Sequence, residues 1–359
     1  MRQQDAIVRI PVSFVTGFLG SGKTTLISAL LRQPEMAGTA VIVNEFGAVG
    51  IDDVVLAETV GNGSVKLLAN GCMCCVADDD LSITLLNLTQ RTIPRPTRIV
   101  IETTGLAEPT NLLHKIMADP RMRSLVRLDG VITTVDAING LQTLHDHPVA
   151  RRQAAMADRR IATKTDMVDA KTVEALEVSL RNLNVYADIL HVTNGVIAAG
   201  QLFGMSLIDP ATGKADLDRW LNTAVQQPDG RNLHQHFRAD GPHLNLSGHH
   251  GDGMGTWLIE AVRPVDWARF SPRVGDIIQQ YGDLLLRLKG VVWTSNDDRP
   301  LVIHGVQRVF HAPIRLNKWP GSPRTTLVAI GSAGAERTAD LLQRALEDTA
   351  VCQTARMGS

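Results

Sequence analysis

The chain has 359 residues, of which 44% are hydrophobic, enough apolar material for a packed core in each of two domains. Its formal net charge of -1 gives no basic field that would favour nucleic acid or an anionic membrane surface as a partner. Four cysteines are too few for a disulfide scaffold at this length. Met1–Ala6 has no apolar core of signal-peptide length and no later stretch reaches the length of a membrane span, so we expect a cytoplasmic protein.

The most informative stretch is Val12–Thr24, in which an apolar strand runs into a glycine-rich turn. Residues Gly17–Thr24 satisfy the pattern G-x-x-x-x-G-K-[ST], whose glycines let backbone N–H groups surround a phosphate. Lys23 is expected to neutralise the β- and γ-phosphates, and Thr24 to place its hydroxyl on Mg²⁺. Because Thr25–Leu31 is apolar at helical spacing, the N-terminus of a helix would point at the anion.

Short apolar strands alternate with helical segments as far as about residue 205. The expected strands after the glycine-rich turn are Ala40–Val43, Ser64–Leu68, Arg98–Ile101, Asp129–Val135 and Arg160–Ala162, with a helical segment at Leu81–Leu88. This alternation predicts an α/β fold, a P-loop NTPase domain with a mainly parallel sheet.

From Asp209 the composition changes to glycine, asparagine, histidine and aspartate, which predicts an exposed linker. Beyond it, expected strands at Trp257–Ile259, Val291–Trp293, Leu301–Ile303 and Leu327–Ile330 accompany an amphipathic stretch over Ser271–Lys289 and a terminal helix over Ala335–Leu346. The second, smaller domain is therefore predicted to be α+β with an antiparallel sheet. The expected boundaries are 1–209 for the P-loop domain, 210–252 for the His/Gly-rich linker, 253–335 for the C-terminal domain, and 336–359 for the terminal helix and tail.

Three acidic residues follow predicted strands and are candidates for holding magnesium or water. Glu102 ends a strand shortly before Gly105, and from this position a carboxylate reaches Mg²⁺, often through water, while the glycine can approach a γ-phosphate. A solvated loop carboxylate is the alternative. Asp53 and Glu45 could also hold metal or water, with Glu45 as a catalytic base, but acidic residues after strands are common because loops are polar.

The tetrapeptide Thr163–Asp166 follows a strand near the end of the same domain. There the Asp166 carboxylate could accept hydrogen bonds from both N1–H and the exocyclic amine of guanine, a donor pair that adenine lacks. Lys-x-Asp triplets are also ordinary surface sequence, so the assignment of guanine recognition depends on the placement of this segment after its strand.

Three of the four cysteines, Cys72, Cys74 and Cys75, lie within four positions after the turn Asn70–Gly71. Such a turn can bring two or three sulfurs onto one ion, and thiolate is a soft ligand suited to Zn²⁺ and similar metals. We therefore expect a transition-metal site. A buried apolar cysteine cluster and a redox pair between Cys72 and Cys75 are the alternatives.

The remaining ligand of this metal site is open among Glu45, His114, a distant histidine and water. Five of the eleven histidines fall in the linker region, where they could bind metal weakly or belong to a solvated polar segment. They are His234, His236, His243, His249 and His250. Cys352 stands alone in the tail and is not expected to bind metal.

Together these segments resemble a known family, the CobW-like P-loop GTPases, relatives of the metallochaperone GTPases that serve urease and hydrogenase maturation. The resemblance rests, in the family's order, on Gly17–Thr24, Val43–Gly47, Gly71–Cys75, Glu102–Pro109 and Thr163–Asp166. It extends to the second domain around Leu285–Gly290 and Arg299–Val302, and so covers most of the chain.

The resemblance implies GTP hydrolysis coupled to the binding and delivery of a transition metal, with zinc and cobalt the usual candidates. It implies GTP or GDP with Mg²⁺ near Thr24, Asp53 and Glu102, guanine read by Asp166, and cargo metal on the three cysteines. The candidate catalytic residues are Lys23, Glu45 and Glu102. The expected nucleotide contacts are Gly17, Gly20, Ser21, Gly22, Lys23, Thr24, Thr25, Gly105, Thr163, Lys164 and Asp166.

Two departures from the family pattern are visible. Thr163 stands where GTPases usually have asparagine, which removes an amide that buttresses the base pocket and bears on base selectivity. Met73 replaces a branched aliphatic residue between the cysteines and keeps the apolar character, so we expect it to be tolerated.

The sequence leaves more than one function open. The first is a slow GTPase that delivers metal to a client protein; the second is a zinc buffer or sensor in which nucleotide is only a structural ligand. A small-molecule kinase is a third, but no acceptor pocket is recognisable. GTP hydrolysis that depends on Lys23 and responds to metal would distinguish the first from the second. The expected partner is the metal-receiving client, with a homodimer as a further candidate and no nucleic acid or membrane.

Overall fold

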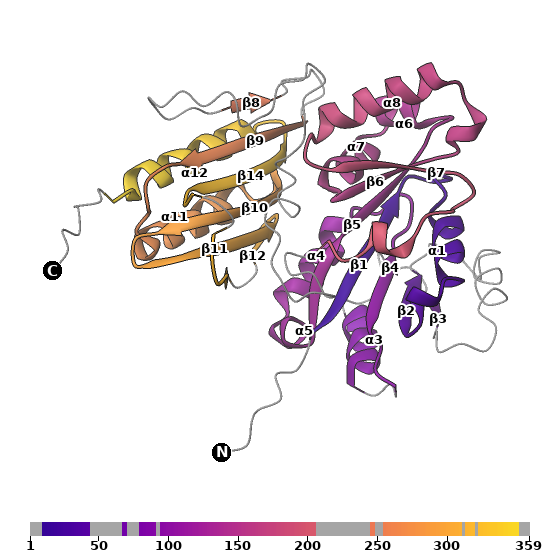
Figure 1. The fold of residues 1–359 in the computed structure, drawn as a ribbon, viewed down its shortest axis with the longest axis horizontal. Coiled ribbons are helices and arrows are strands. Elements are labelled where there is room, and N and C mark those ends of the chain that lie inside the picture. Colours follow the sequence, from indigo (N-terminus) through magenta and orange to yellow (C-terminus); the bar gives the residue numbers. More distant parts are fainter. Residues whose placement is uncertain are drawn as a thin grey trace. The chain divides into compact units, whose positions relative to one another are not determined.

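The computed structural model describes residues 9–43, 67–69, 79–90, 94–205, 245–247, 254–310, 313–319 and 322–351. The chain divides into two compact units (Figure 1). The N-terminal unit comprises Met1–Ser179 and Ala187–Pro210, and the C-terminal unit comprises Leu180–Tyr186 and Ala211–Ser359. Within the described ranges, no helix combines the length and the apolar character needed to cross a membrane.

The N-terminal unit is built on a parallel sheet of seven strands in the order β3-β2-β4-β1-β5-β6-β7. They are β1 (Ile10–Gly17), β2 (Thr39–Val43), β3 (Leu67–Ala69), β4 (Arg98–Glu102), β5 (Val126–Asp136), β6 (Arg159–Thr163) and β7 (Asp188–Val192). The predicted strands are present, except that Ser64–Lys66 of the strand expected over Ser64–Leu68 lie outside the described residues. The prediction of an α/β fold with a mainly parallel sheet is confirmed.

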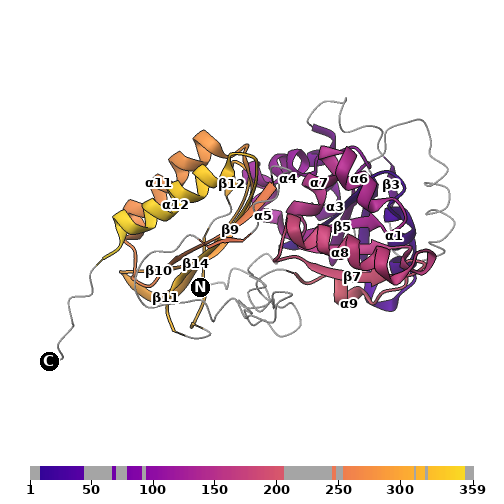
Figure 2. The same ribbon diagram turned by 90° about the horizontal axis from the view of Figure 1, so that it is seen from above.

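Helices cover both faces of this sheet. They are α1 (Lys23–Leu31), α3 (Asp79–Gln90), α4 (Pro109–Ala118), α5 (Pro120–Leu125), α6 (Gly140–Asp146), α7 (Pro148–Met156), α8 (Ala170–Leu183) and α9 (Ala199–Leu202), with short 3₁₀ turns η1 (Pro34–Met36) and η2 (Thr165–Met167). Helices α3 to α8 lie in connections that lead from each strand to one nearer the β7 edge of the sheet. Helix α1 connects β1 to β2, and this connection leads toward the β3 edge. Because such crossovers are right-handed, α1 lies on the opposite face. Figure 2 shows α4, α6 and α7 on one side and α9 on the other.

The hydrophobic core beneath α1 fixes the position of this helix relative to the sheet. Leu26, Ile27 and Leu30 of α1 are buried against strand residues that include Val15 and Val100. Burying a leucine or isoleucine side chain stabilises the fold by roughly 1.5–3 kcal/mol. The N-terminus of α1 is therefore held at the carboxyl end of β1, where the glycine-rich turn joins the two elements.

The C-terminal unit has an antiparallel sheet in the order β12-β11-β10-β14-β9-β8, with β13 paired to β11. Its strands are β8 (Asn245–Ser247), β9 (Met254–Ala261), β10 (Leu285–Thr294), β11 (Asp297–Val306), β12 (Val309–Phe310), β13 (Ile314–Arg315) and β14 (Thr325–Ser332). Two helices, α11 (Trp267–Tyr281) and α12 (Ala335–Thr349), share one apolar core with the sheet (Figure 1). The predicted α+β domain with an antiparallel sheet is confirmed.

One prediction for this unit is wrong. The amphipathic stretch expected over Ser271–Lys289 is not continuous, since α11 ends at Tyr281 and Leu285–Lys289 opens β10. Gly282 caps the helix, with its N–H bonded to the Ile278 carbonyl. Four of the five residues from Leu285 to Lys289 are buried, which fits a central strand that is covered by neighbours on both sides.

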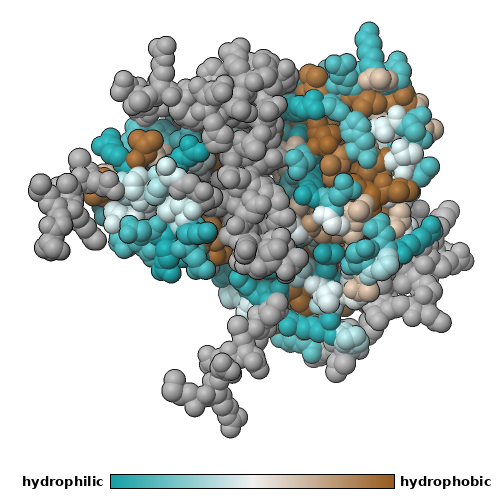
Figure 3. Space-filling model, viewed as in Figure 1, coloured by the Kyte–Doolittle hydropathy of each residue, from teal (hydrophilic) through white to brown (hydrophobic). Residues whose placement is uncertain are grey.

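Exposed apolar side chains occur at the edge of the parallel sheet that carries the glycine-rich turn. On the face shown in Figure 3, hydrophobic residues gather over the N-terminal unit. Leu19 after β1 is 60% exposed, Leu106 after β4 is 57% exposed, and Ile138 after β5 is 44% exposed. The loops at the carboxyl ends of three adjacent strands thus each present an apolar side chain to solvent.

Candidate nucleotide site

The glycine-rich turn between β1 and α1 has a backbone conformation that requires glycine. Gly17, Gly20 and Gly22 have φ angles of 141°, 72° and 90°, in a region that side chains disfavour. A Cβ atom on Gly17 would also collide with the carbonyl oxygen and hydroxyl of Thr134 on β5. The Lys23 ammonium donates to the carbonyl oxygens of Gly17 at 3.0 Å and Phe18 at 3.2 Å, so its positive charge lies against the turn.

Glu102 at the end of β4 meets Thr24 at the start of α1. The Thr24 hydroxyl donates to Glu102 Oε1 at 2.8 Å, and the Glu102 side chain is buried. The contact follows from strand order, because β4 lies beside β1 with Glu102 opposite Val15 and both strands end at the same edge. Hydroxyl and carboxylate oxygens are the donors that Mg²⁺ prefers, so this pair fits a magnesium site.

Gly105, three residues after Glu102, packs directly against the glycine-rich turn. A Cβ atom at Gly105 would lie 2.6 Å from the backbone nitrogen of Leu19 and 2.8 Å from its Cα. Backbone atoms cannot give way as a flexible side chain can, so only glycine allows this approach. The structure thus brings Gly105 to the turn that contains Gly20 and Ser21.

Two threonines on the neighbouring strands β5 and β6 form hydrogen bonds with Ser21. The Ser21 hydroxyl and the Thr134 hydroxyl are hydrogen-bonded at 2.7 Å. The Thr163 hydroxyl, at the end of β6, donates to the Ser21 carbonyl at 2.8 Å. Thr163 therefore buttresses the glycine-rich turn, although it lacks the amide that an asparagine would supply at this position.

The side chain of Lys164, which directly follows β6, reaches the glycine-rich turn. Its ammonium donates to the Gly20 carbonyl at 2.9 Å and to Asp136 Oδ2 at 2.8 Å. Burial alone would raise the pKa of Asp136, but hydrogen bonds from Lys164, the Ile138 N–H and Asn139 outweigh it and hold that pKa below its usual value. The Asp136 carboxyl group therefore remains ionised at neutral pH.

Asp166 lies two residues after Lys164, in η2, and is exposed. Lys164 has a left-handed backbone conformation, with a φ of 56°, which directs the chain from β6 into η2. Thr25, the next residue of α1 after Thr24, is also exposed. Asp166 thus has a carboxylate in solvent at the edge that carries the glycine-rich turn.

Several predicted site residues lie outside the described ranges of the chain. They are Glu45, Asp53, Cys72, Cys74 and Cys75, together with His234, His236, His243, His249, His250 and Cys352. His114 is described and lies exposed on α4. Among the residues that the structure describes, no three His, Cys, Asp or Glu side chains come together as a metal site.

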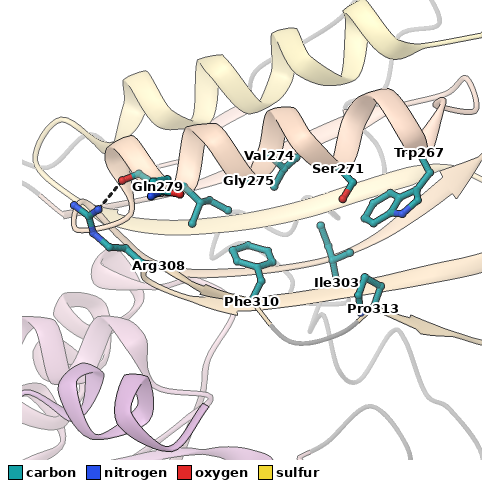
Figure 4. Close-up of a pocket in the computed structure, with 10 residues that line it drawn as sticks. Trp267, Ser271, Val274, Gly275, Gln279, Ile303, Arg308, Phe310 and Pro313 are labelled. Carbon is teal, nitrogen blue, oxygen red and sulfur yellow. Dashed lines mark hydrogen bonds between the residues drawn. The ribbon is translucent and has the colours of Figure 1, made fainter. Parts of the chain in front are cut away.

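Two cavities are relevant to where a ligand could bind. A small one, of about 40 Å³, lies beside the glycine-rich turn and is bordered by Ser21, Thr134, Asp136 and Gln153, among others. A larger one, of about 500 Å³, lies within the C-terminal unit between α11 and β11 (Figure 4). Its lining is mostly apolar, and its charged lining residue, Arg308, is paired with Asp283, so it offers no unbalanced charge for a phosphate.

Residues 11–191 match the profile of the CobW/HypB/UreG nucleotide-binding domain. The chain belongs to this family. Residues 254–350 match the C-terminal domain of cobalamin synthesis protein CobW, so both units of this CobW-family protein have a counterpart in the family.

Two relatives of this CobW-family protein each cover more than four fifths of its length. The zinc chaperone YjiA of Escherichia coli K12 is 31% identical over 326 residues, which span 90% of this chain and 94% of YjiA. The zinc chaperone CobW of a Sinorhizobium species is 30% identical, covering 83% and 85% of the two chains. A crystal structure of Zn(II)-bound YjiA GTPase from E. coli has a TM-score of 0.64 at 26% identity, covering 96% of this chain and 99% of that one.

Sequence reasoning missed three side chains that support this site: Thr134, Asp136 and Gln153. Asp136 could have been found, because it ends β5 opposite Thr163 in the register, next to Lys164 on the chain. Thr134 lies within a strand, and Gln153 lies within an alanine-rich helical segment. Neither carries a signal in the sequence that separates it from ordinary buried polar residues.

Proposed function

We propose that the protein is a GTPase that binds zinc and delivers it to a client protein. The observation that carries the proposal is the 2.8 Å hydrogen bond between Thr24 and Glu102, which joins the glycine-rich turn to a strand-end carboxylate. That pairing supports a nucleotide site with magnesium, and not merely a glycine turn.

In this proposal the backbone of Gly17–Thr24 surrounds the phosphates of GTP, and the Lys23 ammonium stabilises their negative charge. Thr24, Glu102 and Asp53 hold Mg²⁺, which neutralises charge on the β- and γ-phosphate oxygens. Glu45 is proposed to orient the attacking water, and Gly105 to approach the γ-phosphate. Thr163 and Lys164 keep the turn in place through Ser21 and Gly20, as their hydrogen bonds indicate.

For the cargo, we propose one divalent transition metal on Cys72, Cys74 and Cys75. Zinc is favoured because two relatives that each span most of this chain are named zinc chaperones, and cobalt is the second candidate. The nucleotide and cargo sites would both belong to residues 1–209, with 210–252 as a linker to the C-terminal domain. The client would receive zinc after GTP hydrolysis. We also propose that two copies of the chain form a homodimer.

The direct test measures GTP turnover and its coupling to metal. The segment from Asn44 to Cys75 runs from the phosphate region to the thiols, so a loop ordered by the γ-phosphate and Mg²⁺ would also set the cysteine geometry. We expect metal affinity, measured with a competing chelator, to be about 5–150-fold higher with a non-hydrolysable GTP analogue than with GDP. By reciprocity, metal should raise affinity for the analogue by the same factor.

Two outcomes would contradict the proposal. Absence of GTP hydrolysis, with or without zinc, would argue against a GTPase. Indistinguishable metal affinities in the two nucleotide states would leave a zinc buffer or sensor in which the nucleotide is only a structural ligand.

Replacing Asp166 with alanine is expected to remove a preference for guanine. A bidentate carboxylate contact to guanine should be worth roughly 1–3 kcal/mol, because adenine lacks the matching donor pair. Calorimetric titration with GDP and ADP measures the preference in the wild type and in Asp166→Ala. Asp146→Ala, which removes an exposed carboxylate at the end of α6, is the matched control. Equal affinities for GDP and ADP in the wild type would reject the assignment.

A further inference from the structure

One buried side chain on α7 holds the loop that carries Gly105. Gln153 is 1% exposed, and its amide nitrogen donates to the carbonyl oxygens of Gly105 at 3.2 Å and Ala107 at 2.9 Å. Buried backbone carbonyls require a donor, and a single side chain supplies it to both. The path of the loop after β4 therefore depends on Gln153.

Gln153 is itself fixed in position. The Thr133 hydroxyl on β5 donates to the Gln153 carbonyl at 2.7 Å, which ties α7 to the central sheet. The preceding residue, Arg152, forms an ion pair with Glu108 at the end of the same loop. Two consecutive residues of α7 thus hold the loop at three points, two of them buried.

The other side of the loop lies against the glycine-rich turn. Gly105 approaches the backbone of Leu19 so closely that a Cβ atom would not fit between them. His147, which caps the start of α7, stacks on Phe18 of the same turn, with ring centroids 4.4 Å apart and planes inclined by 22°. Helix α7 therefore contacts the glycine-rich turn near its N-terminus and the Gly105 loop near its C-terminus.

We propose that Gln153 is a positioning residue that sets Gly105 for the γ-phosphate of GTP. The inference rests on the proposed GTPase function and goes beyond it, because no contact of Gln153 with nucleotide is required. The turn that would bind the phosphates of GDP is held by Lys23, Thr134 and Thr163, and none of those hydrogen bonds includes Gln153. Loss of the Gln153 amide should therefore weaken the response to GTP and leave GDP binding intact.

The experiment compares Gln153→Met with the wild type. Methionine keeps the length and approximate volume of glutamine but cannot donate to the two carbonyls. We expect affinity for a non-hydrolysable GTP analogue with Mg²⁺ to fall about tenfold, and kcat for GTP to fall by a similar factor, because without these two hydrogen bonds Gly105 is no longer held in its position beside the turn. Affinity for GDP should stay within about twofold, because the hydrogen bonds of Lys23, Thr134 and Thr163 that hold the glycine-rich turn do not include Gln153.

Gln142→Met is the matched control. Gln142 lies exposed on α6 and its amide donates to Asp146, so its replacement should change neither nucleotide affinity nor kcat. Thr133→Val is a second, milder variant, because it keeps the Gln153 amide and removes only the hydrogen bond to its backbone. We expect it to lower affinity for the GTP analogue about threefold, again without a change for GDP.

Three results would overturn the inference: an unchanged ratio of analogue to GDP affinity in both variants, equal losses for analogue and GDP, or an effect of the same size in Gln142→Met. Should Gln153→Met fail to fold, Thr133→Val decides by the same ratio. The binding ratio does not depend on turnover. A wild-type protein without GTP hydrolysis would therefore contradict the proposed function, while the ratio would still test the role of Gln153.

Discussion

Replacing Lys23 with alanine is expected to lower kcat/KM for GTP hydrolysis by about 10²–10³-fold, the loss seen when one preorganised charge or donor is removed from a transition state. The structure gives the reason. The ammonium is buried against the glycine-rich turn, donating to the Gly17 and Phe18 carbonyls, so its charge is already in place before a phosphate arrives. In this low-dielectric surrounding the charge acts more strongly than it would in water.

Lys171→Ala is the matched control, because Lys171 is an exposed lysine on α8 and its loss should leave turnover unchanged. Phosphate release is measured for both variants at saturating and at low GTP, which separates a loss of kcat from a loss of binding. Thermal unfolding of each variant shows whether the fold is kept. Turnover in Lys23→Ala within about threefold of the wild type would mean that the glycine-rich turn does not hold the hydrolysed phosphate.

The strands of the N-terminal unit were predictable because local pattern and burial agree. Ala40–Val43 is a short apolar run between Thr39 and Asn44, and in the structure it is buried in β2, which has a neighbouring strand on each side. Position after a strand also predicted the contact region of Glu102, since the carboxyl ends of parallel strands meet at one edge. The partner of that carboxylate, Thr24, followed from the phosphate-binding pattern itself.

The supporting contacts were not predictable, because they join residues far apart in the chain. Gln153 reaches Gly105 across 48 positions, and Thr163 reaches Ser21 across 142. Which strand lies beside which decides both contacts, and no local pattern carries that information. The amphipathic stretch predicted over Ser271–Lys289 was too long for a different reason. Leu285, Leu286 and Leu288 fit both the helical and the strand period, and Gly282 marks the break between helix and strand.

Replacing Cys72, Cys74 and Cys75 together with serine is expected to abolish high-affinity binding of the cargo metal. Thiolates supply most of the binding energy in cysteine-containing zinc sites, which amounts to roughly 10–16 kcal/mol in small zinc domains. A loss of at least about 4 kcal/mol corresponds to at least about a thousandfold in affinity. Serine keeps the size of each side chain but is a hard, neutral oxygen ligand, so the change tests the sulfur and not the volume.

Cobalt makes the outcome visible, since sulfur-to-metal charge transfer absorbs in the near ultraviolet. The wild type titrated with Co²⁺ should show this band, and added Zn²⁺ should remove it by displacement. Cys352→Ser is the matched control, because it removes the fourth cysteine of the chain and should leave the band unchanged. GDP affinity, measured in parallel, separates loss of the metal site from loss of the fold, because Lys23, Thr134, Thr163 and Lys164 make the hydrogen bonds that hold the glycine-rich turn in the described part of the chain. If the band survived in the triple variant, or were missing from the wild type, the three cysteines would not be the cargo site, and the histidines between residues 234 and 250 would become the next candidates.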